Sequence, residues 1–418
     1  MRDRLKFDVT RLPNGITIYA MPWDVPFADI RLLVPVGHIN NVGKYLPGSA
    51  HMLEHLVFQR SEAFPKPRSF SQTIEMDGGD ASAGTSFSVT SYEMTIAAED
   101  VDEKLASFIE HIFHPVIVTA DIMHEVGIIS NERRRAMSPW YPGEDKTEQH
   151  CRLYWKRDSA LSIRQRFGDD QDLALMGEKD LLSLHQNYSS PDTVLFVGGN
   201  FHLDTIVRVM EKIKTTPQRL EENFEHLSWV NPEYHEVLCE ESNRFFYHLG
   251  GIAEPFSPLR FFGTKFLGTL LTNTVQGTLS DWLRHERGWV YNIGFTVNRS
   301  PKQRANDWEL YIPLSEYEQV KVVRGEIHDR ILRAISDRDL INRELHRQLS
   351  AQLFSYQTLG SAIDEGIYNL LAFGQPISET KKQDILCQAA NSEFLTVLYE
   401  ESWIPGASGE FLALPENV

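Results

Sequence analysis

The first half of the chain alternates between two kinds of hydrophobic pattern. Three short apolar runs are typical of strands or hairpins, and they fall at 15–20, 30–37 and 85–96. Three other stretches repeat apolar residues at helical spacing, and they fall at 51–58, 100–113 and 122–135. These elements do not follow one another with the regular spacing of a parallel βαβ array, so the pattern favours a mixed α+β arrangement.

The second half repeats part of this order. A polar, irregular stretch at 218–236 contains the breaker Asn231-Pro232, and behind it come an apolar strand at 245–251 and an apolar helix at 262–271. Strand, loop with proline and apolar helix occur in the same order before and after the break. We therefore predict two related α+β domains, with the bounds 1–217 for the first, 218–236 for the linker and 237–418 for the second.

Composition excludes several classes of protein. Among 418 residues, 41 are Lys or Arg and 58 are Asp or Glu, and a net charge of −17 argues against a nucleic-acid partner or a polybasic membrane anchor. Three widely spaced cysteines exclude a disulfide scaffold. No apolar run is long enough to span a membrane, and no signal peptide follows the charged start, so we expect a cytoplasmic protein without a membrane partner.

The clearest chemical signal is an H-x-x-E-H motif formed by His51, Glu54 and His55 within the helix predicted at 51–58. Residues three and four apart lie on one face of a helix, so the three side chains are expected to lie together. Two imidazoles at this spacing can bind one Zn²⁺, and the glutamate can take a proton from a water that the metal acidifies. Two histidines on an ordinary amphipathic helix would give the same motif.

A hydrolytic zinc site uses three protein ligands and leaves one position open, so a further ligand is needed. Glu125 and Glu132 are seven residues apart in the helix predicted at 122–135, and therefore point the same way. They lie beside its apolar positions, where a metal ion would offset the cost of burying a carboxylate. The alternative is an exposed acidic helix with ion pairs to Arg133–Arg135.

These residues resemble the motif of the insulinase/pitrilysin family of zinc metallopeptidases, the inverzincins. In that family, a glutamate that orients the site follows the second histidine by 70 residues, and the third ligand follows it by 77. Both spacings from His55 fall on glutamates in this chain. The resemblance implies that His51, His55 and Glu132 bind one zinc ion, that Glu54 is the general base, and that Glu125 orients the site.

The resemblance also covers the segment that follows a pair of glycines. In the family, this segment is an edge strand that pairs with an extended peptide through main-chain hydrogen bonds. The residues so implied in substrate binding are Gly79, Ala81, Ser82, Ala83 and Thr85. The family usually has asparagine where this chain has Ser82, a departure that concerns substrate detail rather than the chemistry.

In the second half, Arg284 and Tyr291 resemble the family's arginine–tyrosine pair, which is also seven residues apart. Gly288 is predicted to end a helix, and Tyr291 to begin the next strand. The resemblance implies that the pair holds the substrate backbone beside the scissile bond and that Tyr291 steadies the developing oxyanion. Without the resemblance, basic residues at a helix end and a core tyrosine explain the same residues.

For the whole chain, the resemblance implies two domains, each a mainly antiparallel sheet flanked by helices, that form one half of a clamshell. Two halves would enclose a chamber in which a zinc endopeptidase cleaves peptides or unfolded segments. Because the zinc motif and the arginine–tyrosine pair are both complete here, a homodimer is expected. Two alternatives remain open: a maturation protease for one precursor peptide that works with a partner subunit, and a non-catalytic scaffold subunit.

Overall fold

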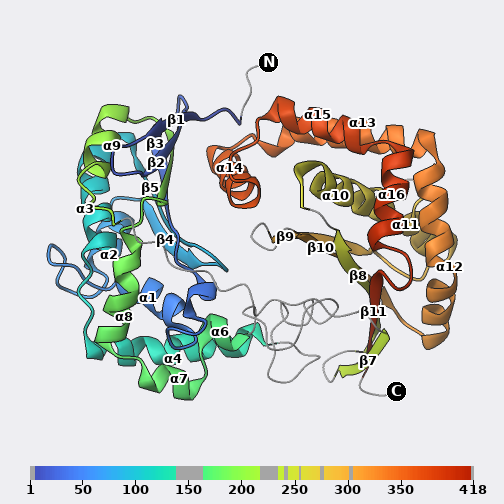
Figure 1. Ribbon diagram of the computed structural model, residues 1–418, viewed down its shortest axis with the longest axis horizontal. Coiled ribbons are helices and arrows are strands. Elements are labelled where there is room, and N and C mark those ends of the chain that lie inside the picture. The colour runs from blue at the N-terminus through green and yellow to red at the C-terminus, as the bar shows by residue number, and fades with distance from the viewer. Residues whose placement is uncertain are drawn as a thin grey trace.

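The computed structural model describes residues 5–137, 163–216, 234–239, 243–253, 256–273, 277–300 and 305–415. These residues form two lobes, and in each lobe helices pack against a β-sheet (Figure 1). The first lobe, blue to green in Figure 1, comes from the first half of the sequence, and the second, yellow to red, from the second half. The predicted α+β class with two related domains is confirmed.

Six strands form the sheet of the first lobe, in the order β1-β2-β6-β3-β5-β4. Their bounds are β1 (Asp8–Arg11), β2 (Thr17–Pro22), β3 (Phe27–Val34), β4 (Asp80–Thr85), β5 (Thr90–Ala97) and β6 (Val194–Gly199). Strands β2 and β6 pair in parallel, and all other neighbouring pairs in this sheet are antiparallel. The apolar run predicted at 85–96 is thus the turn and second strand of the hairpin β4–β5.

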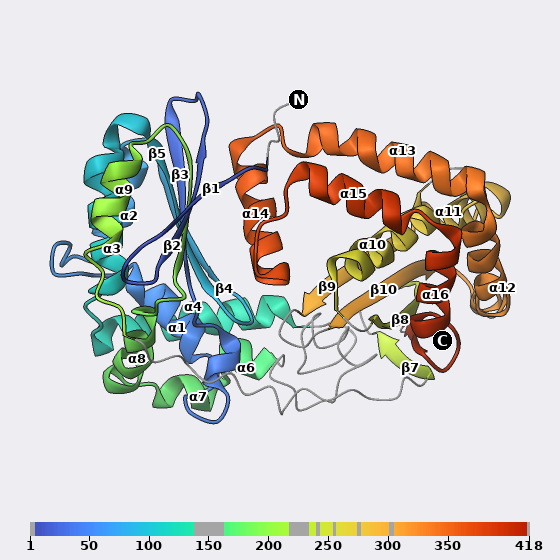
Figure 2. The same cartoon turned by 45° about the horizontal axis from the view of Figure 1, so that its top comes forward.

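The helices of the first lobe are α1 (Ser49–Val57), α2 (Ser69–Met76), α3 (Val101–Phe113), α4 (Thr119–Ala136), α6 (Ile163–Phe167), α7 (Asp170–Leu175), α8 (Glu178–His185) and α9 (Leu203–Met210). Figures 1 and 2 show α2, α3, α8 and α9 on the side of the sheet that faces away from the second lobe. The predicted helices at 51–58, 100–113 and 122–135 correspond to α1, α3 and α4 within a few residues.

Strand β2 shows how the sheet buries both faces. Ile18 and Ala20 join the main core beneath the helices of the first lobe, whereas Tyr19 and Met21 join a separate apolar cluster on the opposite face. Because side chains alternate along a strand, an uninterrupted apolar run places apolar residues on both faces. The sheet is therefore an inner layer of the molecule.

Helix α14 (Leu359–Phe373) covers this opposite face, although it belongs to the second half of the sequence (Figures 1 and 2). Its Leu359 packs with Tyr19 and Phe196 in the separate apolar cluster. Gly198 in β6 allows the close approach, because a Cβ at that position would lie 2.6 Å from Cδ1 of Leu359. The two lobes thus share a packed apolar contact.

An ion-pair group adds to this contact. On β3, Nε of Arg31 lies 2.9 Å from Oδ1 of Asp29, and its Nη1 lies 3.5 Å from a carboxylate oxygen of Glu93 on β5. The same guanidinium also pairs with Asp364 of α14. One arginine therefore connects two strands of the first sheet to the helix that covers them.

Five strands form the sheet of the second lobe, in the order β7-β11-β8-β10-β9. Their bounds are β7 (Tyr234–Cys239), β8 (Phe245–Ala253), β9 (Gly294–Ser300), β10 (Ala305–Leu314) and β11 (Ser408–Pro415). Strands β7 and β11 are parallel, and the other neighbours are antiparallel, so both sheets combine one parallel pair with antiparallel pairs. The remaining helices are α10 (Pro258–Thr272), α11 (Leu279–Asp281), a π-helical turn (Trp282–Glu286), α12 (Tyr317–Ser336), α13 (Arg338–Ser355), α15 (Glu379–Ala389) and α16 (Ser392–Ser402).

The linker predicted at 218–236 lies outside the described residues except for 234–236, which already belong to β7. The second sheet thus begins three residues before the boundary expected from the sequence, and the boundary itself stays a prediction. Among the helices of the described ranges, none combines the length and the apolar character that a membrane crossing requires.

Candidate metal centre

Helix α1 has one apolar face in the core and one polar face that carries the motif. Met52 and Leu56 on the apolar face are at most 1% exposed, which fixes the helix against the first sheet. The helix begins after Gly48, whose φ of 82° favours glycine. A Cβ at Gly48 would lie 2.5 Å from the carbonyl carbon of Phe167, so glycine also permits the close packing of α6. The ring of Phe167 in turn packs edge-on against His51.

The two histidines of α1 and Glu132 of α4 converge on one point. Nε2 of His51 and Nε2 of His55 lie 3.2 Å apart. Oε2 of Glu132 lies 3.4 Å from the first of these nitrogens and 3.7 Å from the second. Of the ligand-type side chains in the described ranges, these three form the one group whose donor atoms lie close enough to share a metal ion.

The spacing of these donor atoms fits zinc. A tetrahedral zinc ion with ligands at 2.0–2.1 Å holds neighbouring ligand atoms about 3.3 Å apart, and the three observed separations are 3.2, 3.4 and 3.7 Å. Two imidazole nitrogens and one carboxylate oxygen are also a donor set that zinc accepts. The residues present therefore fit the metal that the sequence motif implies.

Glu125 and Gln59 hold the His55 ring in place through hydrogen bonds on the side away from Glu132. Nδ1 of His55 lies 2.7 Å from Oε2 of Glu125, and because a carboxylate only accepts hydrogen bonds, Nδ1 carries the proton and donates. When His55 is neutral, this leaves the lone pair on Nε2, the nitrogen that faces His51 and Glu132 and can bind a metal ion. Gln59 donates from Nε2 to Oε1 of Glu125 over 2.8 Å. Since Glu125 is only 2% exposed, both of its oxygens are held by the protein.

The electrostatics of the cluster separate the two histidines. Burial, together with the neighbouring His55, lowers the pKa of His51 to about 3. Burial opposes protonation of His55 as well, but its hydrogen bond to Glu125 and the nearby carboxylates of Glu132 and Glu54 outweigh it and raise the pKa of His55 to about 10. The neighbouring imidazole of His55 lowers the pKa of Glu132. In the absence of a cation, His55 therefore carries a positive charge at neutral pH, and this charge offsets part of the negative charge of the carboxylates around it.

Glu54 lies beside this group without belonging to it. Its Oε2 is 3.9 Å from Nε2 of His51, and it accepts a hydrogen bond of 3.0 Å from the hydroxyl of Thr85. Burial raises the pKa of the Glu54 carboxyl, and His55 and Thr85 oppose that rise. A carboxylate in this position can exchange a proton with a small molecule held at the cluster.

Helix α4 does not pair its carboxylates with its own arginines. Arg133 donates from Nη1 to the carbonyl of Gly168 and from Nη2 to Asp170, each over 2.7 Å. Glu132 instead lies against the two histidines. The alternative of an acidic helix balanced by Arg133–Arg135 does not describe the observed contacts of Glu132.

Strand β4 carries the residues that the sequence implicated in peptide binding. It is the last strand of its sheet and pairs with β5 on one side, for example Ser82 with Glu93. Ala81 and Ala83 pack toward the core. Gly79 lies just before the strand, where a Cβ would come within 2.6 Å of the carbonyl oxygen of Thr95. Within the described ranges, the outer side of β4 bears no further strand.

Arg284 and Tyr291 contact each other but lie away from the proposed metal ligands His51, His55 and Glu132. Cζ of Arg284 is 4.6 Å from the centre of the Tyr291 ring, and Tyr291 is 77% exposed. Helix α11, which leads into the turn bearing Arg284, lies in the second lobe, whereas α1 lies in the first (Figures 1 and 2).

The prediction that Tyr291 begins a strand is wrong, because β9 begins at Gly294. The positive φ of Gly288 (68°) instead turns the chain into a loop.

Sequence reasoning missed two contributors to the centre, Gln59 and Phe167. Gln59 follows His55 by four residues, so helical spacing signals that both extend from the same side of α1 and its continuation. It also missed that Thr85, expected to contact substrate, donates to Glu54. No sequence signal identifies Phe167, because its contact with His51 depends on how α6 packs.

Comparison with known proteins places this arrangement in a family. Residues 22–152 match the family model described as insulinase (peptidase family M16), and residues 178–340 match the model described as peptidase M16 inactive domain. The chain belongs to the insulinase family of peptidases, family M16.

Several individual proteins show the same similarity. Zinc protease PqqE of Helicobacter pylori is 29% identical over 226 residues, which is 52% of this chain and 48% of that protein. The α subunit of the mitochondrial-processing peptidase of Bos taurus is 25% identical over 199 residues, which is 47% of this chain and 37% of that protein. The matches thus cover less than half the length of these curated relatives. A protease from Helicobacter pylori of known crystal structure has the same fold, with a TM-score of 0.79 at 16% identity over 98% of this chain and 99% of that one.

Proposed function

We propose that this chain is a zinc-dependent endopeptidase. The observation that carries the proposal is the convergence of His51, His55 and Glu132, whose donor atoms lie 3.2–3.7 Å apart, separations that suit zinc. The carboxylate of Glu54 lies beside them, with Oε2 3.9 Å from Nε2 of His51. Zinc held by these three residues supplies the Lewis acidity that activates water and polarises a peptide carbonyl.

Glu54 is the proposed general base. The hydroxyl of Thr85 donates to Oε2 of Glu54 and orients this carboxylate, which takes the proton of the attacking water. The same carboxyl group then returns this proton to the amine that leaves when the peptide bond breaks. Glu125, held by Gln59, keeps His55 in the tautomer whose Nε2 is a ligand.

The proposed substrate is an extended peptide or unfolded segment that adds to the outer edge of β4. Gly79, Ala81, Ser82 and Ala83 present main-chain groups along that edge, and Thr85 at its end contacts the general base. Recognition through main-chain hydrogen bonds makes few demands on substrate side chains. This supports an enzyme that acts on peptides rather than on one fixed sequence.

Arg284 and Tyr291 are proposed to act across a homodimer. Tyr291 is exposed and Arg284 is half-buried in the lobe that lacks the proposed metal ligands, so the phenol and the guanidinium stacked on it are available to a site on a second copy of the chain. There the guanidinium and phenol would hold the substrate backbone and steady the oxyanion.

A non-catalytic or partner-dependent role is the second candidate. It is favoured by the match of residues 178–340 to the model described as an inactive domain, and by similarity to a protein named as a subunit of a processing peptidase. In this case the chain would serve as a scaffold or would need a homologous partner subunit to cleave one precursor peptide.

The deciding experiment is cleavage of a mixed peptide library by the purified chain alone, read by mass spectrometry, with and without a zinc chelator. Glu54→Gln should abolish cleavage while keeping about one zinc per chain, because the amide cannot take a proton and the ligands are untouched. Cleavage by the unmodified chain that the chelator stops supports the proposal. An unmodified chain that binds zinc but cleaves no peptide assigns it to the second candidate, and turnover by Glu54→Gln removes Glu54 from its role.

A further inference from the structure

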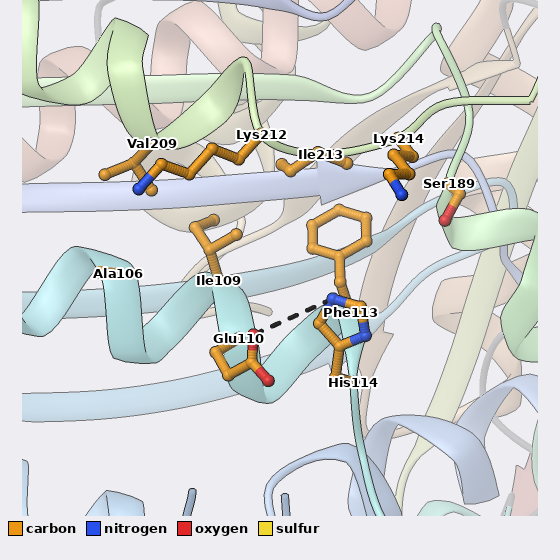
Figure 3. Close-up of a pocket in the computed structure, with 10 residues that line it drawn as sticks. All are labelled: Ala106, Ile109, Glu110, Phe113, His114, Ser189, Val209, Lys212, Ile213 and Lys214. Atoms are coloured by element: carbon orange, nitrogen blue, oxygen red, sulfur yellow. Dashed lines mark ion pairs between the residues drawn. The ribbon is translucent and has the colours of Figure 1, made fainter. Parts of the chain in front are cut away.

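A pocket of about 470 Å³ opens in the helical layer of the first lobe, between the C-terminal parts of α3 and α9 (Figure 3). It shares no residue with the metal cluster, the edge strand β4 or the arginine–tyrosine pair. Pockets that bind small molecules commonly enclose about 300–1,000 Å³, so its size suits such a ligand.

The floor of this pocket is apolar. Ile109 and Phe113 of α3, together with Val209 of α9 and Ile213 just after it, line the pocket and are 7–9% exposed. Phe108, the residue before Ile109 in α3, is fully buried in the core. The four side chains therefore form the outermost layer of the core, and Figure 3 shows the Phe113 ring below Ile213 and to the right of Ile109. A ligand that covers them gains from removing apolar surface from water.

The rim is basic. Lys212 and Lys214 line the pocket, and neither forms an ion pair with any carboxylate of the residues that the structure describes. The acidic group of the rim, Glu110, lies 3.9 Å from Nε2 of His114, its neighbour one turn along. Figure 3 shows the Lys214 ammonium group near Ser189 at one end of the pocket. Two ammonium groups that form no ion pair within the described ranges, in a protein of net charge −17, favour an anionic ligand here.

The surroundings restrict the charge and shape of that anion. Both α3 and α9 end at the pocket, and helix C-termini carry partial negative charge, which disfavours a dianion such as phosphate. The lining includes no arginine for bidentate binding. A single carboxylate suits one lysine, which acts as a point charge, and Figure 3 shows the ammonium groups of Lys212 and Lys214 at opposite ends of the pocket. The apolar floor then requires a hydrophobic body attached to that carboxylate.

We propose that this pocket binds an amphipathic carboxylate. Its carboxylate lies at the ammonium group of Lys214, beside Ser189, and its apolar body covers Phe113 and the three aliphatic side chains around it. Such a ligand has two sources, a free aliphatic acid or the C-terminal carboxylate of a peptide that ends in apolar residues.

Isothermal titration calorimetry of the full chain tests the proposal with two probes of this chemistry, octanoate and N-acetyl-leucyl-phenylalanine. The corresponding neutral amides are the matched controls, and we expect them to bind at least tenfold more weakly because they lack the charge. Tighter binding of octanoate identifies the aliphatic source, and tighter binding of the dipeptide identifies the peptide source. Absence of binding by both carboxylates, or equal binding of acids and amides, overturns the proposal.

Two variants separate the charge from the cavity. Lys214→Met removes an ammonium group at nearly constant length and should weaken binding of the preferred acid about tenfold. Ala106→Phe, at an exposed position that lines the pocket, should abolish binding by filling it while both lysines remain. Lys179→Met, at an exposed position of α8, is the control and should leave affinity unchanged. Thermal unfolding verifies that each variant is folded, and unchanged affinity in folded Lys214→Met and Ala106→Phe also overturns the assignment.

Discussion

Gln59 offers a sharp test of the proposed zinc centre, because it touches neither the cluster nor any substrate. Its Nε2 donates to Oε1 of Glu125 over 2.8 Å, and Glu125 holds His55 through its other oxygen over 2.7 Å. In Gln59→Leu, the carboxylate keeps one donor and can rotate away from the orientation that serves His55. We expect zinc to bind more weakly, since such outer contacts fix the ligand tautomer and ring position.

The magnitude follows from the exposure of the two partners. A hydrogen bond to a charged group is worth about 1.5–3 kcal/mol when the acceptor has no replacement. Glu125 is 2% exposed, but Gln59 is only partly buried, so water can take over part of its role. We therefore expect a loss of about 1 kcal/mol, which is roughly a fivefold weaker affinity for zinc.

The assay is competition for zinc between the protein and a chromogenic chelator at constant pH and ionic strength. Gln72→Leu, an exposed glutamine on α2 of the same lobe, is the control and should leave the affinity unchanged. Gln59→Lys retains a donor and should restore most of the affinity. If folded Gln59→Leu binds zinc within twofold of the unmodified chain, the inference that Gln59 orients Glu125 is refuted.

Three further predictions concern the ligands, the dimer and the core. Glu132→Gln should weaken zinc binding more than tenfold in equilibrium dialysis, and full occupancy at stoichiometric zinc would contradict its role as a ligand. A mixed dimer of Glu54→Gln and Arg284→Ala chains should regain part of the cleavage that each variant lacks if the arginine acts across the dimer; no recovery in a verified mixed dimer counts against this. Burial lowers the pKa of His111 from its ordinary 6.5 to about 4, so an unfolded chain takes up this proton first as the pH falls. Stability should therefore be lost between pH 6.5 and 4, by up to about 3 kcal/mol. In urea unfolding at pH 7 and pH 5, His111→Phe should show a smaller loss than the unmodified chain, and equal losses would disprove the assignment.

Sequence spacing identified the convergent part of the centre because helical geometry is regular. Positions three and four apart on α1 put His51, Glu54 and His55 on one face, and positions seven apart on α4 put Glu125 and Glu132 on one face, before any packing is known. The match of two long spacings to a family pattern then joined the two helices. The fold class was predictable for the same reason, since alternating and helical hydrophobic periods were distinct.

What the sequence could not supply depends on contacts between elements. Thr85 was placed on a strand, but its hydroxyl bond to Glu54 depends on the distance between β4 and α1. The loop position of Tyr291 depends on Gly288, whose left-handed conformation turns the chain before β9. The apolar residues of β2 predicted a strand but not the distant helix that covers one of its faces. Local sequence patterns reveal the periodicity of one helix or strand. These three features depend instead on the angles and distances at which different elements pack, which local patterns do not contain.

The position of α14 limits how this protein can be divided. Residues 1–217 contain the proposed zinc ligands and the general base, which makes them an attractive gene fragment to express alone. That fragment would leave Tyr19, Met21, Leu33 and Phe196 without the helix that buries them, because their cover is encoded about 140 residues further on. Such a bare apolar sheet face promotes aggregation. The smallest portable unit of this chain therefore has to include α14, and chimeras between relatives should exchange α14 together with the strands that it covers.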